Sequence, residues 1–473
     1  MNDPNPARTR WRAVALLIFA LGWRLLFALT RTYQEADELW YSLPTAERFA
    51  QGEWLFYISG TNYGAPVQEF LSGLLIRFFG VSVATLRLPV VVIGSLAVVV
   101  AFFSLRTVVR ERVAFALALL LACANSSVGH YTAFAHPCYA TIFLLVGALQ
   151  LLTMRLARER TAGGWWALAA TMGAAFYVFK LSLLQSVASL AWLWWRSENA
   201  AQLRARAATT AGARRLRQAA AVLGAGALLL APVAYHYLTR RATFSIAPWE
   251  KVLLAGALGV LLAGAALAAR ALVRPGWRET WPALACALAL ALIPLPAALW
   301  HARIEAPRRA ARGGQIYTET KFSLKHLHTW PHQARLAIQG VIPALVVGRF
   351  DILVGQPTET EPLDWRAGVS VLLLGAVAWF GGKRLRARGW RVPLSAGDTV
   401  LIAPFVLTAV LMFPSWLLHS ECCFRYLVPF LPGGLLLVYR ALEEPLTRHP
   451  RLTTGLVAVL ILQNGYDCYH YME

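Results

Sequence analysis

Residues 33 to 66 lie between two hydrophobic parts of the chain and hold an acidic cluster in their first half, Glu35, Asp37, Glu38 and Glu47. A carboxylate can take the proton of a reacting hydroxyl, so such a cluster is a candidate general base. Asp37 and Glu38 are adjacent and follow an apolar run by only a few residues. We take these two as the candidate catalytic residues and the other two as ordinary loop residues. The alternative is that the two acids belong to an ordinary solvated loop or that the pattern ADEL only caps a helix.

Two basic residues are candidates for binding a phosphate group. Lys180 lies inside the apolar stretch 165–195, and Arg425 begins a late apolar run. Cationic side chains hold phosphates and stabilise them as they leave. Lys180 has a plainer alternative, because a lysine near a helix end can reach the membrane interface with its charged head.

Histidine and tyrosine residues complete the candidate set. Most of them belong to the segment GHYTAFAHPCY (129–139) or to the neighbourhood of Arg425. The substrate-binding candidates are Tyr63, His130, Tyr131, His136, Tyr139 and Tyr426. The histidines of HLHTWPH (326–332) fit no standard zinc spacing, and the six cysteines show no metal-ligand pattern. We therefore assign no metal ligands and no definite cofactor, with a divalent cation left open.

The composition indicates that these residues are positioned by membrane helices. Of the 473 residues 58% are hydrophobic and 15% are charged, and the mean hydropathy is +0.52. Soluble domains carry about 25% charged residues. Apolar runs long enough to cross a bilayer recur along the chain, for example 11–30 and 252–273. The run at 11–30 contains Arg24 and lacks a small-residue cleavage site, so it is a permanent helix and not a signal peptide.

The distribution of basic residues predicts the topology. Arginines accumulate before the first run, which places the N-terminus in the cytoplasm and the acidic stretch outside. The net charge of +21 is explained in the same way, so we expect no nucleic-acid partner. The apolar stretch 67–80 is too short to span and suits an interfacial or re-entrant helix. The predicted cytoplasmic loops are 106–112, 155–163, 196–217, 270–280, 383–396 and 440–451.

This topology gives a single all-α domain, 1–473, of about thirteen transmembrane helices, with the C-terminus outside. Two extramembrane segments are sizeable, the first external loop 31–87 with its acidic pair and interfacial helices, and the second external loop 300–366. The stretch 165–195 is too long for one membrane helix and short for two. The basic loop that follows it favours two short helices with Lys180 at the external turn, and the alternative is one long tilted helix.

The sequence from ADELWYS through FGVSVATLRLP resembles the first external loop of the GT-C integral membrane glycosyltransferases. The branch that it is most similar to contains the protein O-mannosyltransferases and the lipid A aminoarabinose transferases. Three later stretches, HYTAFAHPCYATIF, FYVFKLSLL and FRYLVPFLPGGLLL, resemble family segments in the same order. The similarity is concentrated in residues 30 to 145, with a short late match at 424–437.

The resemblance implies a GT-C-like helix bundle whose external loops form the site. A polyprenyl-phosphate-linked sugar would enter from the membrane, and the sugar would pass to an acceptor hydroxyl with inversion. In the protein mannosyltransferases the aspartate of the acidic pair is the base, which matches Asp37, with Glu38 as its neighbour. Lys180 and Arg425 would bind the donor phosphate.

The chain departs from the family pattern at several places. The aminoarabinose transferases have an acidic–basic pair before two prolines, where this chain reads Tyr63, Gly64, Ala65 and Pro66. Acidic residues common after the third helix are replaced by Phe134, Ala135 and His136. We also expect no large external domain after the last helix. These departures argue against aminoarabinose transfer to lipid A and leave the acceptor open.

The sequence thus predicts a hexosyl or pentosyl transferase of the bacterial inner membrane with a periplasmic active site. Its expected partners are a polyprenyl-phosphate-linked sugar, membrane lipids and a glycan, lipid or protein acceptor. The chain has no Walker-type phosphate loop and no dinucleotide-binding turn, which disfavours an ATP-driven activity. The alternative is a transporter or flippase of polyprenyl-linked sugars, against which stands the lack of a visible internal repeat. The sugar, the acceptor and the oligomeric state are not encoded in any pattern that we recognise.

Overall fold

The computed structural model describes residues 6–30, 37–58, 65–124, 126–179, 181–196, 285–286, 289, 292–293, 365–387, 395–418 and 423–472. Tyr63, Lys180, the side chain of Arg425 and nearly all of the predicted loop 300–366 lie outside the described residues.

Every regular element within these ranges is a helix, as the all-α prediction requires. The elements are α1 (Pro6–Thr30), η1 (Glu38–Ser42), α2 (Leu43–Ala50), α3 (Val67–Phe79), α4 (Val83–Arg106), α5 (Glu111–Ala122), α6 (Ser126–Ala133), α7 (Tyr139–Leu156), α8 (Ala162–Val178), α9 (Ser182–Trp195), α19 (Trp365–Ala387), α20 (Ala396–Leu418), η5 (Cys423–Phe430), α21 (Leu431–Arg448) and α22 (Pro450–Met472).

The described residues contain three helices that are long and apolar enough to cross a membrane, α1, α4 and α7. They have 25, 24 and 18 residues, which suits a hydrocarbon core about 30 Å thick. The stretch 165–195 forms two helices, α8 and α9, which contact each other, so the prediction of a helix pair is confirmed. The predicted total of about thirteen spans extends over residues outside the described ranges and stays a prediction.

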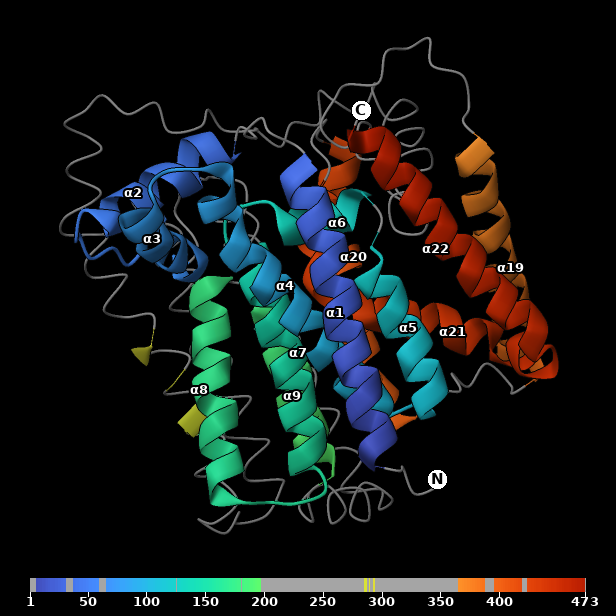
Figure 1. Ribbon diagram of the computed structural model, residues 1–473. Coiled ribbons are helices and arrows are strands. Elements are labelled where there is room, and N and C mark those ends of the chain that lie inside the picture. The colour runs from blue at the N-terminus through green and yellow to red at the C-terminus, as the bar shows by residue number, and fades with distance from the viewer. Residues whose placement is uncertain are drawn as a thin grey trace, which may run out of the picture.

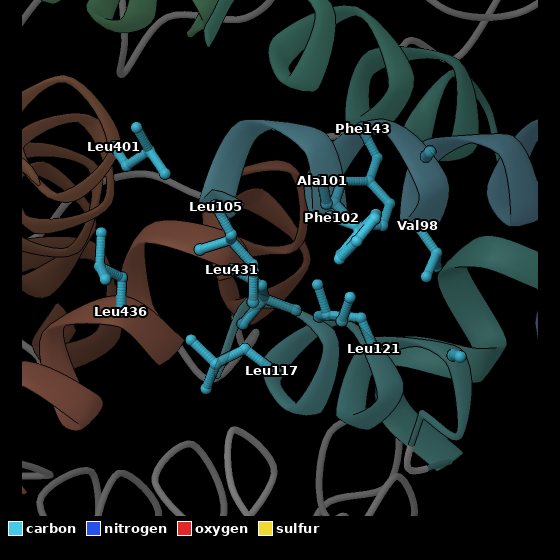
Figure 2. Close-up of a cluster of buried hydrophobic side chains, with 14 of the residues drawn as sticks. Val98, Ala101, Phe102, Leu105, Leu117, Leu121, Phe143, Leu401, Leu431 and Leu436 are labelled. Atoms are coloured by element: carbon cyan, nitrogen blue, oxygen red, sulfur yellow. The ribbon is translucent and has the colours of Figure 1, made fainter. Parts of the chain in front are cut away.

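Helix α4 lies at the centre of the packing and contacts α1, α3, α5, α6 and α7. Figure 2 shows its inner part, where Val98, Ala101, Phe102 and Leu105 meet leucines of α5 and α21 and Phe143 of α7. All four α4 residues are completely buried. Ser82 begins the helix with a capping box, because its hydroxyl accepts the Thr85 N–H and the Thr85 hydroxyl accepts the Ser82 N–H.

Helices α2 and α3 form a short pair beside the start of α4 (Figure 1). Gly73 makes their close approach feasible, because a Cβ at this position would lie 2.6 Å from the Phe49 Cβ and 2.7 Å from the Ala46 carbonyl oxygen. At 13 residues α3 is too short to span a bilayer, as its short apolar run predicts, and its interfacial position stays a prediction. Phe78 and Phe79 at its end are exposed, as is Trp54 after α2, and exposed aromatic residues suit a membrane interface.

Several segments predicted to be cytoplasmic meet at one end of the bundle. Arg12 near the start of α1 pairs with Glu111 at 2.6 Å, and Arg106 at the end of α4 reaches the same carboxylate at 3.2 Å. Arg440 of α21 donates to the Val108 carbonyl at 2.9 Å. The N-terminal segment and the predicted loops 106–112 and 440–451 are therefore on the same side.

The acidic pair lies at the other end, where α1 ends and α4 begins. Arg87, in the first turns of α4, donates to the Ala28 carbonyl near the end of α1 at 2.7 Å. Figure 1 places the start of α1 and the end of α22 at opposite ends of the bundle, as the predicted topology requires. Which of the two ends faces the cytoplasm stays a prediction.

Candidate functional site

Asp37 and Glu38 stand at the start of a short helical segment that continues into α2. Residues Glu38–Ser42 form a π-helical turn, closed by a hydrogen bond from the Leu43 N–H to the Glu38 carbonyl five residues earlier. π-helical turns inside helices are frequent at functional sites. Asp37 lies just before this turn and Glu38 is its first residue, and the two acids have different surroundings.

Glu38 is held completely inside the protein by Arg87. The guanidinium donates from Nε to Oε1 at 2.8 Å and from Nη2 to Oε2 at 2.6 Å. The N–H of Ala135 donates to Oε1 at 2.8 Å, and the Arg87 guanidinium stacks 4.0 Å from the centre of the Phe134 ring. A buried charge needs such partners, since burial without them costs several kcal/mol. Glu38 therefore joins α4 and the segment after α6 to the acidic turn.

Asp37 is partly exposed and contacts a histidine. Its Oδ2 lies 3.1 Å from Nδ1 of His136, and the two side chains are 26% and 5% exposed. The second ring nitrogen of His136, Nε2, is in direct contact with Nε2 of His130. Both histidines are buried, so a row of three groups runs from the partly exposed carboxylate into the protein.

The segment between α6 and α7 gives His136 its position. The His136 N–H donates to the Phe134 carbonyl at 2.7 Å, which makes a tight turn after α6. Cys138 follows in the left-handed region with φ of 66°, where a residue other than glycine is uncommon. Pro137 between them cannot donate a backbone hydrogen bond. The turn points the ring of His136 back toward Asp37.

Arg24 fixes α6 beneath this turn. It is fully buried in α1 and donates to the carbonyls of Leu121 at 3.0 Å and Ala122 at 3.2 Å, the last residues of α5. Its Nε donates to the Thr132 hydroxyl of α6 at 3.1 Å. A cation at the carbonyl end of a helix satisfies groups that have no partner within the helix. The break between α5 and α6 is therefore filled by a charged side chain from α1.

An aromatic row links the histidine pair to η5. Tyr131 lies 5.1 Å from both His136 and Tyr139, measured between ring centres. Tyr139 is 6.2 Å from Phe179, which stacks on Tyr426 at 5.8 Å. Phe179 precedes Lys180, and Tyr426 follows Arg425, so the sequence neighbours of both predicted phosphate ligands are in contact.

The structure thus brings together seven of the predicted site residues, Asp37, Glu38, His130, Tyr131, His136, Tyr139 and Tyr426. Tyr63, Lys180 and the side chain of Arg425 lie outside the described residues, so their predicted roles stay predictions.

Glu69 of α3 is a buried acid next to the site. The sequence pattern alone does not mark this residue as a site residue. Its Oε1 accepts hydrogen bonds from the Ser42 hydroxyl at 3.0 Å and from Gln68 Nε2 at 3.1 Å. The same Gln68 nitrogen donates to the His136 carbonyl. Burial raises the pKa of Glu69 to about 7, although these hydrogen bonds and its own backbone N–H lower it in part. Glu69 connects the acidic turn to the histidine turn.

Arg87 is the second residue that the sequence analysis did not assign to the site. It belongs to the stretch FGVSVATLRLP that carries the family resemblance, but the resemblance gives this arginine no role in the site. One signal was available, because a charged side chain within an apolar helix usually pairs with an opposite charge or with backbone carbonyls.

The described part of the chain contains no group of three or more His, Cys, Asp or Glu side chains that could hold a metal ion. Asp37, His136 and His130 form a row in which each member contacts the next. The chemistry that this row offers directly is proton transfer at the Asp37 carboxylate.

No protein-family model matches the sequence, and no curated protein is significantly similar to it. Among solved structures, the Archaeoglobus fulgidus oligosaccharyltransferase in complex with Zn and sulfate is 14% identical, with a TM-score of 0.47 over 98% of this chain and 52% of that chain. AglB from the same organism, in complex with an inhibitory peptide and a dolichol-phosphate, is 14% identical with a TM-score of 0.47 over 98% of this chain and 55% of that one.

ArnT from Cupriavidus metallidurans, bound to undecaprenyl phosphate, is 17% identical with a TM-score of 0.34. The match covers 92% of this chain and 78% of ArnT. This chain spans about half the length of the archaeal oligosaccharyltransferase chains that it matches.

Proposed function

We propose that the protein is an inverting membrane glycosyltransferase that moves a sugar from a polyprenyl-phosphate donor to an acceptor hydroxyl. The observation that carries the proposal is the contact of the partly exposed Asp37 carboxylate with His136, beside a Glu38 that is fully engaged by Arg87. The sequence resemblance to the GT-C first external loop supports the same assignment of Asp37. We place the site on the periplasmic side of a bacterial inner membrane.

In the proposed reaction Asp37 is the general base. The acceptor oxygen forms a bond to the anomeric carbon of the donor sugar as its proton passes to the Asp37 carboxylate. The bond from that carbon to the phosphate oxygen breaks, and the electron pair leaves with the polyprenyl phosphate. A single displacement from the opposite face inverts the configuration.

The two acids have separate proposed roles. Both oxygens of Glu38 accept hydrogen bonds from Arg87, so its carboxylate is neutralised and immobile. Glu38 is therefore a positioning residue that holds the turn carrying Asp37. Lys180 and Arg425 are the proposed ligands of the donor phosphate, where positive charge stabilises the leaving group.

The test is an assay of the purified full-length protein with Asp37→Asn. The donors are hexoses and pentoses linked to undecaprenyl phosphate and carrying a label on the sugar. The readouts are labelled sugar transferred to acceptors in envelope extracts and the formation of free undecaprenyl phosphate. We expect the variant to lose about 10² to 10⁴ in rate, the usual contribution of a general base. Glu53→Gln is the control, because this carboxylate is 48% exposed and pairs only at the surface with Arg48.

Transfer at the wild-type rate by a folded Asp37→Asn protein would remove the base role from this residue. Movement of intact lipid-linked sugar across vesicle membranes, with no sugar transfer by the wild-type protein, would replace the proposal by the flippase alternative.

A further inference from the structure

We infer that His130 fixes the tautomer of His136, and that His136 in this tautomer keeps Asp37 ionised and correctly oriented. We call this arrangement of the two histidines a tautomer lock. The inference deepens the proposed function and rests on it, because it assigns the positioning of the general base. The starting point is the row Asp37 Oδ2, His136 Nδ1, His136 Nε2 and His130 Nε2, in which each atom contacts the next.

The first step follows from the chemistry of the carboxylate. An ionised carboxylate can only accept hydrogen bonds, so His136 must present a protonated Nδ1 to Oδ2 of Asp37 across 3.1 Å. A neutral imidazole carries one N–H only. With the proton on Nδ1, the Nε2 of His136 is a bare acceptor.

The second step follows from the contact between the rings. Two Nε2 atoms in direct contact require one donor and one acceptor. Because His136 is the acceptor, His130 must carry its proton on Nε2 and donate it. The protonation of both neutral rings is thus determined by the single requirement that Asp37 is a base.

The consequence of losing the His130 donor also follows. Without it His136 is free to carry its proton on Nε2, which leaves a bare Nδ1 facing the carboxylate. Two acceptors in contact repel each other, so in this tautomer of His136 the contact forms only when Asp37 takes a proton, whereas the His130 N–H at Nε2 favours the tautomer that donates to the ionised carboxylate. A protonated Asp37 cannot act as the base, so His130 acts on the reaction through His136.

The surroundings are rigid enough for this assignment to matter. The His136 carbonyl accepts from Gln68 Nε2, and its ring is buried between His130 and Tyr131. The His130 ring packs edge-on against Tyr131 and Phe134, with ring centres 5.2 and 5.0 Å apart. These contacts hold the two rings in place beside Asp37.

The experiment uses substitutions that keep or remove one N–H at a time. In His136→Asn the amide nitrogen takes the place of Nδ1, and an amide cannot change tautomer. In His130→Gln the amide nitrogen takes the place of Nε2. We expect both variants to stay within about tenfold of the wild-type kcat, and His136→Ala and His130→Leu to lose about 10²-fold with little change in KM.

The decisive comparison is His130→Leu in two backgrounds. In the wild-type background this substitution should lower kcat by about 10²-fold. In the His136→Asn background it should lower kcat only a few-fold, because no tautomer remains to be fixed. If His130 is only a packing residue, the cost is the same in both backgrounds, and the inference is overturned. Thermal unfolding of each variant is the control for folding.

A second measurement does not depend on activity. The ¹⁵N chemical shifts of the two histidine side chains, from protein labelled at histidine, should report a protonated Nδ1 for His136 and a protonated Nε2 for His130. The opposite tautomers, or a doubly protonated ring, overturn the inference. If Asp37→Asn abolishes transfer while the histidine variants behave as wild type, the tautomer lock fails and the proposed function stands. If Asp37→Asn keeps full transfer, the base role of Asp37 fails and the inference fails with it, whereas absence of sugar transfer by the wild-type protein is the result that removes the proposed function.

Discussion

Replacement of Glu69 by glutamine should change how the stability of the protein depends on pH. The pKa of this carboxyl is raised from 4.5 to about 7, mainly because the group is buried. An elevated pKa in the folded state means that folding favours the neutral form. The stabilising contribution of Glu69 is therefore fully present below pH 4.5 and is lost as the pH rises through about 7.

The magnitude follows from the difference of about 2.5 between the two pKa values. At 1.36 kcal/mol for each pKa unit, this difference corresponds to about 3 kcal/mol of unfolding free energy. The carboxyl is fully buried, so solvent screening does not reduce the figure. In the wild-type protein this amount should disappear between pH 4.5 and pH 8. In Glu69→Gln it should not, because the amide does not titrate.

The assay is reversible unfolding by SDS in mixed micelles, followed by the fluorescence of the 18 tryptophans. The quantity to compare is the change in unfolding free energy between pH 5 and pH 8, because the added amide N–H alters the absolute value at any single pH. Glu53 is a surface carboxylate, so Glu53→Gln should show the same pH dependence of the unfolding free energy as the wild type. Parallel curves for the wild type and Glu69→Gln would refute the assignment of Glu69 as a buried acid.

Further substitutions test the packing at two places, the Arg87–Glu38 pair and the approach of α20 and α21. Arg87→Met should lower the unfolding free energy by about 3 to 5 kcal/mol, since it leaves Glu38 buried without its cation, and Glu38→Leu added to it should restore most of the loss. A double variant no more stable than Arg87→Met would contradict this. Gly433→Ala should be strongly destabilising, because its Cβ would lie 1.9 Å from the backbone carbonyl oxygen of Leu401, whereas Gly455→Ala, with nothing within 4 Å, should stabilise by up to about 1 kcal/mol. Both are measured by the same unfolding assay, and equal effects at the two glycines would show that the approach of α20 and α21 is looser than described.

Much of the helical framework follows from the sequence because apolar length and charge position are local properties. The stretch 165–195 divides into α8 and α9 as its length and its basic flank indicate, and α3 is as short as its apolar run. Asp37 could be selected because it follows the first apolar helix within a family-like pattern. These features need no knowledge of which segments meet in space.

The partners of the acids could not be predicted in this way. The position of Arg87 in an apolar run indicates that it needs a partner but not which one, and Glu69 reads as a charge on an amphipathic helix. Their roles depend on contacts across 49 and 27 residues of sequence, to Glu38 and Ser42. Likewise, the contact of His136 with Asp37 depends on a turn with a left-handed Cys138, which no residue pattern requires.

The π-helical turn at Glu38–Ser42 also bears on how this segment can change in evolution. Its hydrogen bond spans one residue more than an α-helical bond, so removal of a single residue would let the segment become a regular α-helix. Helical content would be preserved, but Asp37 and Glu38 would rotate by about 100° relative to α2 and leave both His136 and Arg87. We therefore expect the number of residues in this turn to be kept even where the residues between Glu38 and α2 change. In related genes we expect substitutions in this turn and no insertions or deletions.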